Sequence, residues 1–357
     1  MKLLHAADFH LDSPFQGFTP EQQESLRKAS LELPFAVARL CREKECQLLL
    51  LSGDLFDGPY TWKSYEALAS ALEEAKVPVI IAPGNHDHVG RNSPWLSEHW
   101  PENVHIFTSS SLQSRVFEDL DCRVYGAGYT AMDCPGLLQS FTASGQERYH
   151  IGVLHGDPTA PDSPYCPITR SQVENSGLTY LALGHIHKGG SFRAGNTLCA
   201  WPGCPMGRGY DEPGQKGVLF VDLDTASQAE FVPLMGFPKF YTQELPLLES
   251  PEAALSALLP GAPTKDFYRI TLTGQWETPD LAALSRKFSH IPNLTLRDAT
   301  TPPVDPWGSA GEDSLEGTYF RLLQEKLPGA DPHTQEIIQL AARISRQLLD
   351  GQEVKLP

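Results

Sequence analysis

Long apolar runs, paired cysteines and an excess of positive charge are all missing from this sequence. None of its apolar runs approaches the roughly eighteen residues of a membrane-spanning helix, so we expect no such helix. The opening Met-Lys-Leu-Leu-His-Ala-Ala-Asp reaches a charge too soon for a signal peptide. The seven cysteines include no Cys-x-x-Cys pair, which favours free cytosolic thiols over disulfides or a zinc finger.

Positive charge is scarce throughout the chain. The chain has 28 lysines and arginines but 44 acidic residues, so its formal net charge is −16 at pH 7. Neither the first 230 residues nor the remainder is basic, which argues against a general basic nucleic-acid binder. If the protein acts on a polyanion, bound metal ions and a few clustered arginines must supply the positive potential.

The length of the chain and the changes of composition along it predict more than one domain. With 357 residues, 41% of them hydrophobic and 20% charged, the sequence is typical of a globular protein with a large and a smaller domain. We predict a large domain over 1–235 and a compact α+β unit over 236–300. Residues 301–357 should be a linker and two C-terminal helices, because 300–311 is rich in Pro, Asp and Gly.

Short apolar runs recur along the chain, each bounded by a turn, and predict buried strands. The strands expected to end in functional residues are 2–7, 47–51, 77–82, 149–154 and 178–183. Helices are expected over 20–44, which Pro34 should kink or divide, and over 60–75. Residues 197–201, 217–222 and 229–233 favour the second sheet of a sandwich. The helix expected over 332–349 carries an apolar stripe that suits docking on its own domain or on a partner.

Residues able to bind metal follow five of these strands at the point where each one ends. Open α/β sheets bind ligands at the carboxyl ends of their strands, so we expect these side chains to meet. They are Asp8 and His10, then Asp54, then Asn85 beside His86, then His155, and finally His185 and His187. A lone His-x-His would be weak evidence, but five such endings in chain order are hard to attribute to chance.

The chemistry of this set narrows the choice of metal. Nitrogen and oxygen ligands without a thiolate suit Mn, Fe or Zn and disfavour an all-oxygen Mg or Ca site. Leaving aside His86, which lies beside Asn85, the set has seven groups, which are too many for one ion. Shared between two ions, with Asp54 bridging through its two oxygens, they leave each ion four protein ligands and open positions.

Four further positions near these motifs could support the site. Asp57 either supports the ligands from outside or caps the following helix, and Asp87 is expected in a similar supporting position. Arg208 and Lys216 either contact phosphate or are simply solvated.

In combination, the motifs Asp-x-His, Gly-Asp-x-x-Asp, Gly-Asn-His-Asp, His-Gly and Gly-His-x-His resemble the calcineurin-like metallophosphoesterase superfamily over roughly residues 1–235. The resemblance implies an α/β fold, a four-layer αββα sandwich with a small C-terminal α+β cap and terminal helices. It implies two divalent ions, for which we expect Mn²⁺ with Fe or Zn as alternatives, and His86 as general acid or transition-state stabiliser. The implied ligand sets are Asp8, His10, Asp54 and His187 for one ion, and Asp54, Asn85, His155 and His185 for the other.

The start His-Ala-Ala-Asp-Phe-His-Leu-Asp-Ser-Pro-Phe and the stretch 201–209 resemble DNA-repair exonucleases of the SbcD and YhaO type. This implies a cytoplasmic 3′→5′ DNA exonuclease without membrane association, with single-strand endonuclease activity as a further option. Its partners would be DNA and an SMC-like coiled-coil ATPase of the SbcC/YhaN type, docked on the terminal helices, with a homodimer as a further option. Asp57 departs from eukaryotic and archaeal relatives, which have histidine there.

Other functions remain open at this point. The protein-phosphatase branch is disfavoured, because Asp57-Gly58-Pro59 and Asn85-His86-Asp87 stand where that branch carries Asp-Arg-Gly and Asn-His-Glu. A phosphodiesterase or phosphatase acting on a small molecule or nucleotide is slightly favoured by the acidic composition. A scaffold that binds DNA ends or an ATPase without turnover is disfavoured, since a retired site would be expected to lose ligands.

Overall fold

The computed structural model describes residues 1–225, 228–303 and 305–351. Packing divides the chain into two compact units, one of residues 1–242 with 265–268 and one of 243–264 with 269–357. The division predicted at 235 and 300 stays a prediction. Residues 226–227, 304 and 352–357, which fall within the predicted domain and terminal segment, lie outside the described residues.

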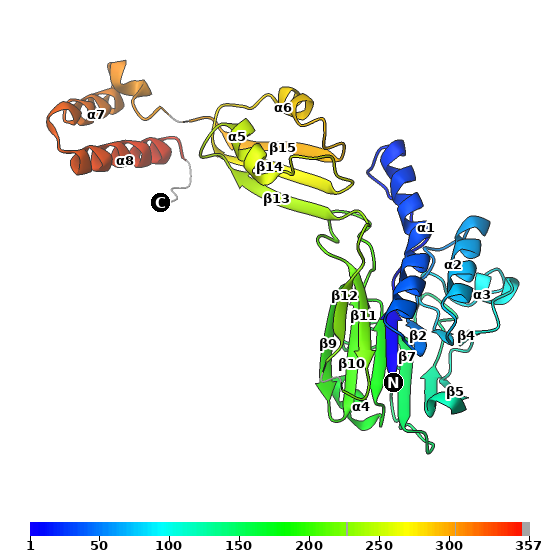
Figure 1. The fold of residues 1–357 in the computed structure, drawn as a ribbon. Helices are drawn as coiled ribbons and strands as arrows, with labels where there is room; N and C mark the ends of the chain where they lie inside the picture. The colour runs from blue at the N-terminus through cyan, green and yellow to red at the C-terminus, as the bar shows by residue number, and fades with distance from the viewer. Residues whose placement is uncertain (226–227, 304, 352–357) are drawn as a thin grey trace. The chain divides into compact units, whose positions relative to one another are not determined.

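The first unit contains two six-stranded sheets that share one plan (Figure 1). In the first sheet four strands run parallel and two antiparallel strands extend the edge beside β1. Its order is β12 (Glu230–Pro233), β11 (Gly217–Asp222), β1 (Lys2–Ala6), β2 (Leu48–Leu51), β3 (Val79–Ile81) and β4 (Val104–Ile106). The four leucines of β2 are all buried, as expected for a strand covered on both faces.

The second sheet also has four parallel strands, with one antiparallel strand at each edge. Its order is β5 (Gln113–Phe117), β6 (Cys122–Gly126), β7 (Tyr149–His155), β8 (Tyr180–Gly184), β10 (Thr197–Gly203) and β9 (Lys188–Ala194). The carboxyl ends of β7 and β8 therefore lie side by side. His155 is the last residue of β7, and His185 and His187 follow β8.

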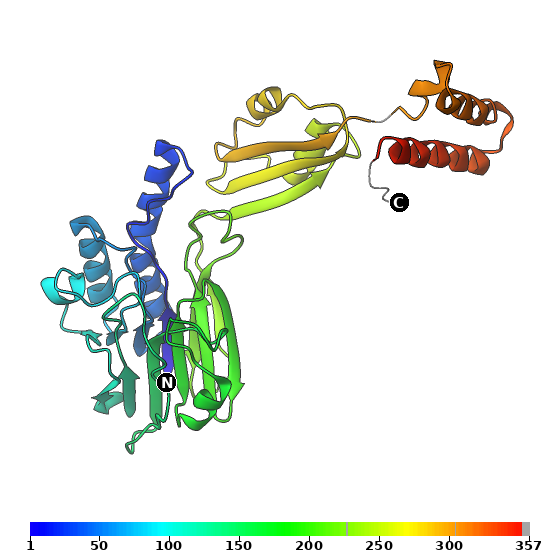
Figure 2. The same ribbon diagram turned by 180° about the vertical axis from the view of Figure 1, so that it is seen from behind.

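Three apolar clusters hold the layers together. One lies between the sheets, where Leu50 and Ile80 pack with Ile151 and Ala182. A second joins the outer face of the first sheet to α1 (Pro20–Glu43) and α2 (Trp62–Glu74), which lie side by side (Figure 2). The third covers the second sheet with α4 (Arg170–Asn175) and loops. The order helix, sheet, sheet, helix confirms the predicted four-layer αββα sandwich.

The structure corrects three expectations for this unit. α1 continues through Pro34, so this proline does not divide the helix, whereas the kink stays a prediction. Leu33 and Pro34 are buried, and their packing offsets the hydrogen bond that proline cannot donate. β11 and β12 join the first sheet rather than forming part of a second one. Strand β9 was not predicted, since its Lys-Gly-Gly-Ser start has little strand propensity. Short helices also form at α3 (Pro94–Ser97) and η1 (Glu118–Leu120).

The second unit contains a small α+β element and a pair of helices. Its three-stranded sheet consists of β13 (Phe240–Pro246), β14 (Phe267–Gln275) and β15 (Leu294–Thr301), although the first residues of β13 and β14 belong to the first unit. The sheet is accompanied by α5 (Pro251–Leu258) and α6 (Leu281–Lys287). The paired elements are η2 (Gly308–Gly311), α7 (Leu315–Gln324), η3 (Leu327–Gly329) and α8 (Pro332–Leu349). Phe320 and Ala342 are buried between α7 and α8, yet Ile337 and Leu348 of the predicted stripe remain exposed. Within the described ranges, no helix combines the length and apolarity of a membrane span.

Candidate metal centre and active site

The predicted ligands occupy tight turns that follow the strands. Four of them have left-handed backbone, with φ of 55° at Asp8, 47° at His10, 51° at Asp54 and 93° at His185. Such conformations cost on the order of 1–3 kcal/mol for residues other than glycine and persist only where the surrounding structure imposes them. Their concentration at neighbouring strand ends marks this edge of the sandwich as a functional site.

Glycines allow these turns to approach one another. A Cβ added at Gly84 would lie 2.2 Å from Oδ1 of Asp54, and one at Gly184 would lie 2.0 Å from the carbonyl oxygen of Ser52. Both distances are far inside van der Waals contact. Only glycine therefore permits the loops after β2, β3 and β8 to pack as closely as the site requires.

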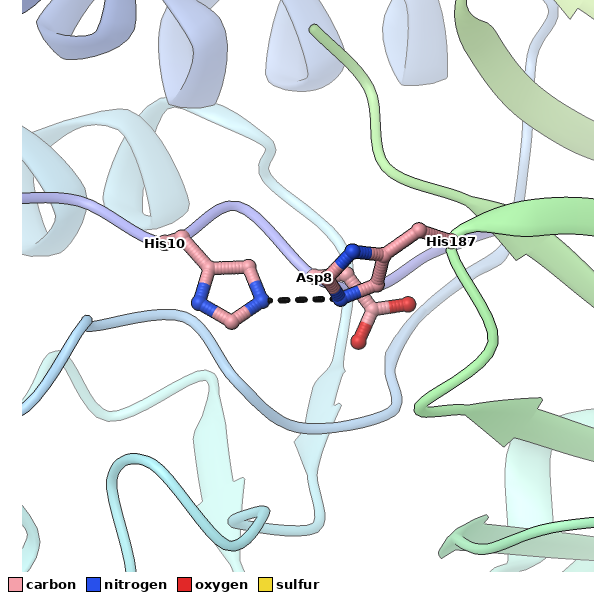
Figure 3. A group of neighbouring side chains, drawn as sticks. All are labelled: Asp8, His10 and His187. Carbon is pink, nitrogen blue, oxygen red and sulfur yellow. Dashed lines mark hydrogen bonds between the residues drawn. The ribbon is translucent and has the colours of Figure 1, made fainter. Parts of the chain in front are cut away.

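Asp8, His10 and His187 form one group of converging atoms (Figure 3). Nε2 of His10 and Nε2 of His187 face each other at 3.1 Å, although the two residues are 177 positions apart. Oδ2 of Asp8 is buried and has no hydrogen-bond partner among the described residues. A buried carboxylate oxygen without a partner is costly, so this group fits a bound cation.

His155, Asn85 and Asp54 form the second group. Nδ1 of His155 lies 2.9 Å from the carbonyl oxygen of Ser52, which can only accept, so Nδ1 carries the proton. Nε2 then presents a lone pair toward Oδ1 of Asn85 at 3.0 Å and Oδ2 of Asp54 at 3.3 Å. Imidazoles that bind metal are commonly held in this way by a carbonyl, and the converging lone pairs fit a second cation.

Asp54 lies between the two groups. Its Oδ2 is 3.7 Å from Nε2 of His10 and 3.3 Å from Nε2 of His155, and its Oδ1 accepts a hydrogen bond from the backbone N–H of His86. Burial by itself would raise the pKa of Asp54, but the charges of His155 and His10 hold this pKa well below its usual range. Without a bound cation, burial opposes protonation of His155, yet Asp54 and Asp8 raise the pKa of its imidazole to about 9, so a metal ion that binds Nε2 would displace a proton from that nitrogen.

His185 adjoins both groups. Its backbone N–H donates to Oδ1 of Asp8, and its ring centroid lies 5.2 Å from that of His155. Tyr165 covers the other side of the imidazole at 4.6 Å. The structure thus brings all seven predicted ligands to one place, whereas their assignment to individual ions remains a prediction.

His86 lies at the exposed side of this centre with Asp57 behind it. Nδ1 of His86 is 2.8 Å from Oδ1 of Asp57, and this hydrogen bond raises the pKa of His86. The same carboxylate oxygen is 3.4 Å from Nδ1 of His10. Asp57 is not the cap of α2, because Thr61 occupies that position, so of the two alternatives only support of the histidines fits.

Asp87 joins the loops after β2 and β3. Its Oδ2 accepts from the backbone N–H of Leu55 at 2.7 Å, and its Oδ1 accepts from that of Gly84 at 2.7 Å. Burial, together with the nearby Asp54, raises the pKa of Asp87 to about 7. Asp87 therefore holds in register the two turns that carry Asp54 and Asn85.

Glu212 is a site residue that sequence reasoning missed. It is buried, and its Oε1 lies 2.7 Å from Nδ1 of His187. Arg208 donates from Nη2 to the same oxygen at 2.8 Å, and its Nη1 lies 3.8 Å from Oδ2 of Asp57. The guanidinium is therefore engaged by carboxylates, and contact with phosphate stays a prediction. No spacing links Glu212 to the histidines, and in the sequence it reads only as part of a Glu-Pro-Gly turn.

Comparison with known proteins agrees with this geometry. The calcineurin-like phosphoesterase family matches residues 1–189, more than half of the chain, and the chain belongs to that family. Members of this family hold a dinuclear centre of divalent metal ions and hydrolyse phosphoesters.

Two bacterial relatives stand out by sequence. The uncharacterized metallophosphoesterase YhaO of Bacillus subtilis is 34% identical over 244 residues, which cover 62% of this chain and 57% of that protein. The matched region thus spans somewhat more than half the length of YhaO. In the same organism, the SbcD subunit of nuclease SbcCD is 23% identical over 64% of this chain and 68% of its own length.

Among solved structures, TT1561 of Thermus thermophilus aligns with 65% of this chain and 98% of its own, at 13% identity and a TM-score of 0.41. A dimetal phosphatase from Danio rerio aligns with 62% and 91%, at 14% identity and a TM-score of 0.42.

Proposed function

We propose that this protein is a dinuclear-metal phosphodiesterase that acts as a Mn²⁺-dependent DNA exonuclease in DNA repair, digesting from 3′ to 5′. The observation that carries the proposal is the convergence of seven nitrogen and oxygen ligands in two groups joined by Asp54. The similarity to one component of a nuclease supports DNA as the substrate. The seven free cysteines support a reducing, cytoplasmic location.

The ligand charges explain why such a centre would bind a phosphodiester. Two divalent ions held by Asp8, Asp54 and the neighbouring ligands would leave a local surplus of about two positive charges, which would attract the substrate and lower the pKa of bound water. Ser52 and Glu212 orient His155 and His187 so that their ring nitrogens point into the centre.

His86 supplies the proton chemistry in this proposal. Asp57 orients its imidazole and favours the protonated form, which can donate to the departing oxygen or stabilise negative charge on the phosphoryl group. A positioned acid of this kind typically contributes about 10²–10⁴ in rate. Its exposure places it where a bound strand could reach it.

The proposed contacts with DNA and with an ATPase partner involve the part of the chain after residue 235. We assign residues 1–235 to the nuclease domain, 236–300 to a cap over DNA and 301–357 to the linker and terminal helices. An apolar surface on the helix pair, lined by Leu315, Tyr319, Leu348 and Leu349, supports docking of an SMC-like coiled-coil ATPase. Replacing Leu348 and Leu349 with glutamate is expected to abolish co-elution with such an ATPase.

End-labelled DNA tests the proposal directly. The purified protein is stripped with chelator, restored with Mn²⁺ and assayed on 3′- and 5′-labelled strands beside bis-(p-nitrophenyl) phosphate. We expect Mn²⁺ to restore both activities, with nucleotides released from the 3′ end. His86→Ala should retain its metals but lose about 10²–10⁴ in turnover, whereas His99→Ala, at an exposed histidine without a motif, should behave as the parent.

The outcomes separate the alternatives. Hydrolysis of bis-(p-nitrophenyl) phosphate without action on DNA would favour the small-molecule phosphodiesterase. Binding of DNA ends without turnover in any divalent metal would favour the scaffold. Parental cleavage of DNA by His86→Ala would remove the role assigned to that histidine.

A further inference from the structure

Arg208 lies between the two carboxylates that support histidines of the candidate site. Its Nη2 donates to Oε1 of Glu212 at 2.8 Å, and its Nε donates to Oε2 of the same carboxylate at 3.4 Å. Its Nη1 lies 3.8 Å from Oδ2 of Asp57, which is beyond hydrogen-bond distance but close enough for the opposite charges to attract. One guanidinium therefore faces both the carboxylate behind His86 and the carboxylate behind His187.

The turn that carries Arg208 is closed by the same glutamate. The backbone N–H of Arg208 donates to Oε2 of Glu212 at 2.8 Å, and the backbone N–H of Glu212 donates to the carbonyl oxygen of Gly209 at 3.1 Å. A Cβ added at Gly207 would lie 2.6 Å from the carbonyl oxygen of Glu212, so glycine is needed for the turn to close this tightly. The turn and the ion pair together fix the guanidinium where it also faces Asp57.

These three charged groups are largely withdrawn from solvent. The side chains of Glu212, Asp57 and Arg208 are 7%, 15% and 22% exposed. Partial burial weakens the screening of their charges by water. A lysine would offer a single point charge, which cannot make the bidentate contact with Glu212 and also face Asp57. The arrangement therefore depends on the shape of the guanidinium as well as on its charge.

We propose that Arg208 is a positioning residue, which holds Asp57 and Glu212 in place and through them sets the orientation of His86 and His187. The inference rests on the proposed function, in which His86 acts on the substrate and His187 binds an ion. It gives Arg208 a part in turnover that does not require contact with the substrate phosphate. Loss of Arg208 should therefore have two separate effects, one on the ion that His187 binds and one on the step that His86 assists.

Metal binding by full-length Arg208→Met measures the first effect, with Arg123→Met as the matched control. Arg123 also holds a carboxylate through Nε and Nη2, that of Glu147, and its side chain is 26% exposed. It pairs with His150 near the start of β7, whereas His155 ends that strand. Calorimetric titration with Mn²⁺ should show one site weakened about 10–100-fold in Arg208→Met and both sites unchanged in Arg123→Met.

Kinetics at saturating Mn²⁺ measure the second effect and separate positioning from phosphate binding. On bis-(p-nitrophenyl) phosphate, Arg208→Met should lower kcat and kcat/KM equally, by about 10-fold or more and within the roughly 10²–10⁴ assigned to His86, while KM stays unchanged. In the His86→Ala background, Arg208→Met should lower kcat no further, because the histidine that it positions is already gone. Thermal unfolding verifies that the variants are folded, and Arg208→Lys repeats the series if Arg208→Met is not.

The outcomes distinguish positioning from substrate contact. A higher Kd for single-stranded DNA, with a lower slope of log Kd against log salt and parental kcat, would make Arg208 a phosphate contact and overturn the proposal. Equal falls in kcat with and without His86 would also overturn it.

Other outcomes distinguish the role of Arg208 from the function on which it rests. If the parent hydrolyses bis-(p-nitrophenyl) phosphate but does not cut DNA, the nuclease is wrong, and the kinetics on the small ester still decide the role of Arg208. If the parent hydrolyses neither substrate, the proposed function fails and the metal titration decides. Weakening of one site in Arg208→Met then supports positioning, and parental binding of both ions overturns it.

Discussion

The two sheets of the sandwich share one plan but contribute different atoms to the metal centre. Turns after the first sheet provide all of the candidate oxygen ligands, from Asp8, Asp54 and Asn85, together with the nitrogen of His10. Turns after the second sheet provide only imidazoles, from His155, His185 and His187. The first sheet alone offers four of the seven candidate ligands and the second only three, so the candidate centre forms where the two sheets meet.

Hydrogen bonds between the turns of the two sheets hold the candidate ligands in position. The carbonyl of Ser52, after β2, orients His155 at the end of β7. Asp8, after β1, accepts from the backbone of His185, after β8. Glu212, in the connection that leads from the second sheet back to the first, orients His187. Each sheet therefore sets the geometry of the other sheet's ligands.

Removing the side chain that lies between the two groups, Asp54, should have the largest effect. Asp54→Ala deletes the oxygen that lies between His10 and His155, so we expect binding of both ions to fail and turnover of bis-(p-nitrophenyl) phosphate to fall at least about 10³-fold. Metal content by elemental analysis and steady-state kinetics measure this. Asp119→Ala, at an exposed carboxylate, is the control. A variant that retained two ions would refute the bridging role.

Loss of an orienting group should have a smaller effect. Glu212→Gln removes the charge that fixes His187 and pairs with Arg208, and such changes typically weaken metal binding by about 10–100-fold. Calorimetric titration with Mn²⁺ should show one site weakened and the other unchanged. The exposed Glu102→Gln should leave both sites as in the parent. Equal weakening of the two sites would show that Glu212 acts on the whole fold instead.

Because the turns of the two sheets pack closely, substitutions at two glycines should have different effects on stability. Gly184→Ala would place a methyl group against the carbonyl of Ser52, and relief of that overlap should cost about 1–3 kcal/mol in the free energy of unfolding. Gly90→Ala, which meets nothing within 4 Å, should change it by less than about 0.5 kcal/mol. Urea denaturation of the metal-free proteins makes the comparison. Equal effects would mean that the two turns do not need to approach so closely.

The smallest effect concerns an ion pair on the second sheet. Hydrogen bonds from Arg123 lower the pKa of Glu147 to about 2, so the stability gained is present above the unfolded-state pKa and is lost as pH falls from about 4.5 toward 2. The urea midpoint of Glu147→Gln should therefore decline slightly less than that of the parent between pH 5 and pH 3. Glu230→Gln, in the more exposed pair with Lys44 on the first sheet, is the control. A steeper decline in Glu147→Gln would contradict the assignment.

Much of the fold and most of the site follow from local patterns. The buried strands were predictable because apolar runs such as Leu48–Leu51 are bounded by turns, and the ligands because each follows one of these strands directly. The unbroken helix through Pro34 and the strand β9 were not predictable, since packing overrides a poor local propensity in both. The insertion of β11 beside β1 also depends on contacts between distant segments.

The amino-acid sequence by itself determined which side chains could bind metal, because those residue types follow strand ends in a fixed order. Only the tertiary structure decided that Glu212 supports His187 and that Arg208 is held by carboxylates. The physical reason is that a ligand motif is a local arrangement within one turn, whereas an orienting partner is defined by the approach of residues remote in the chain.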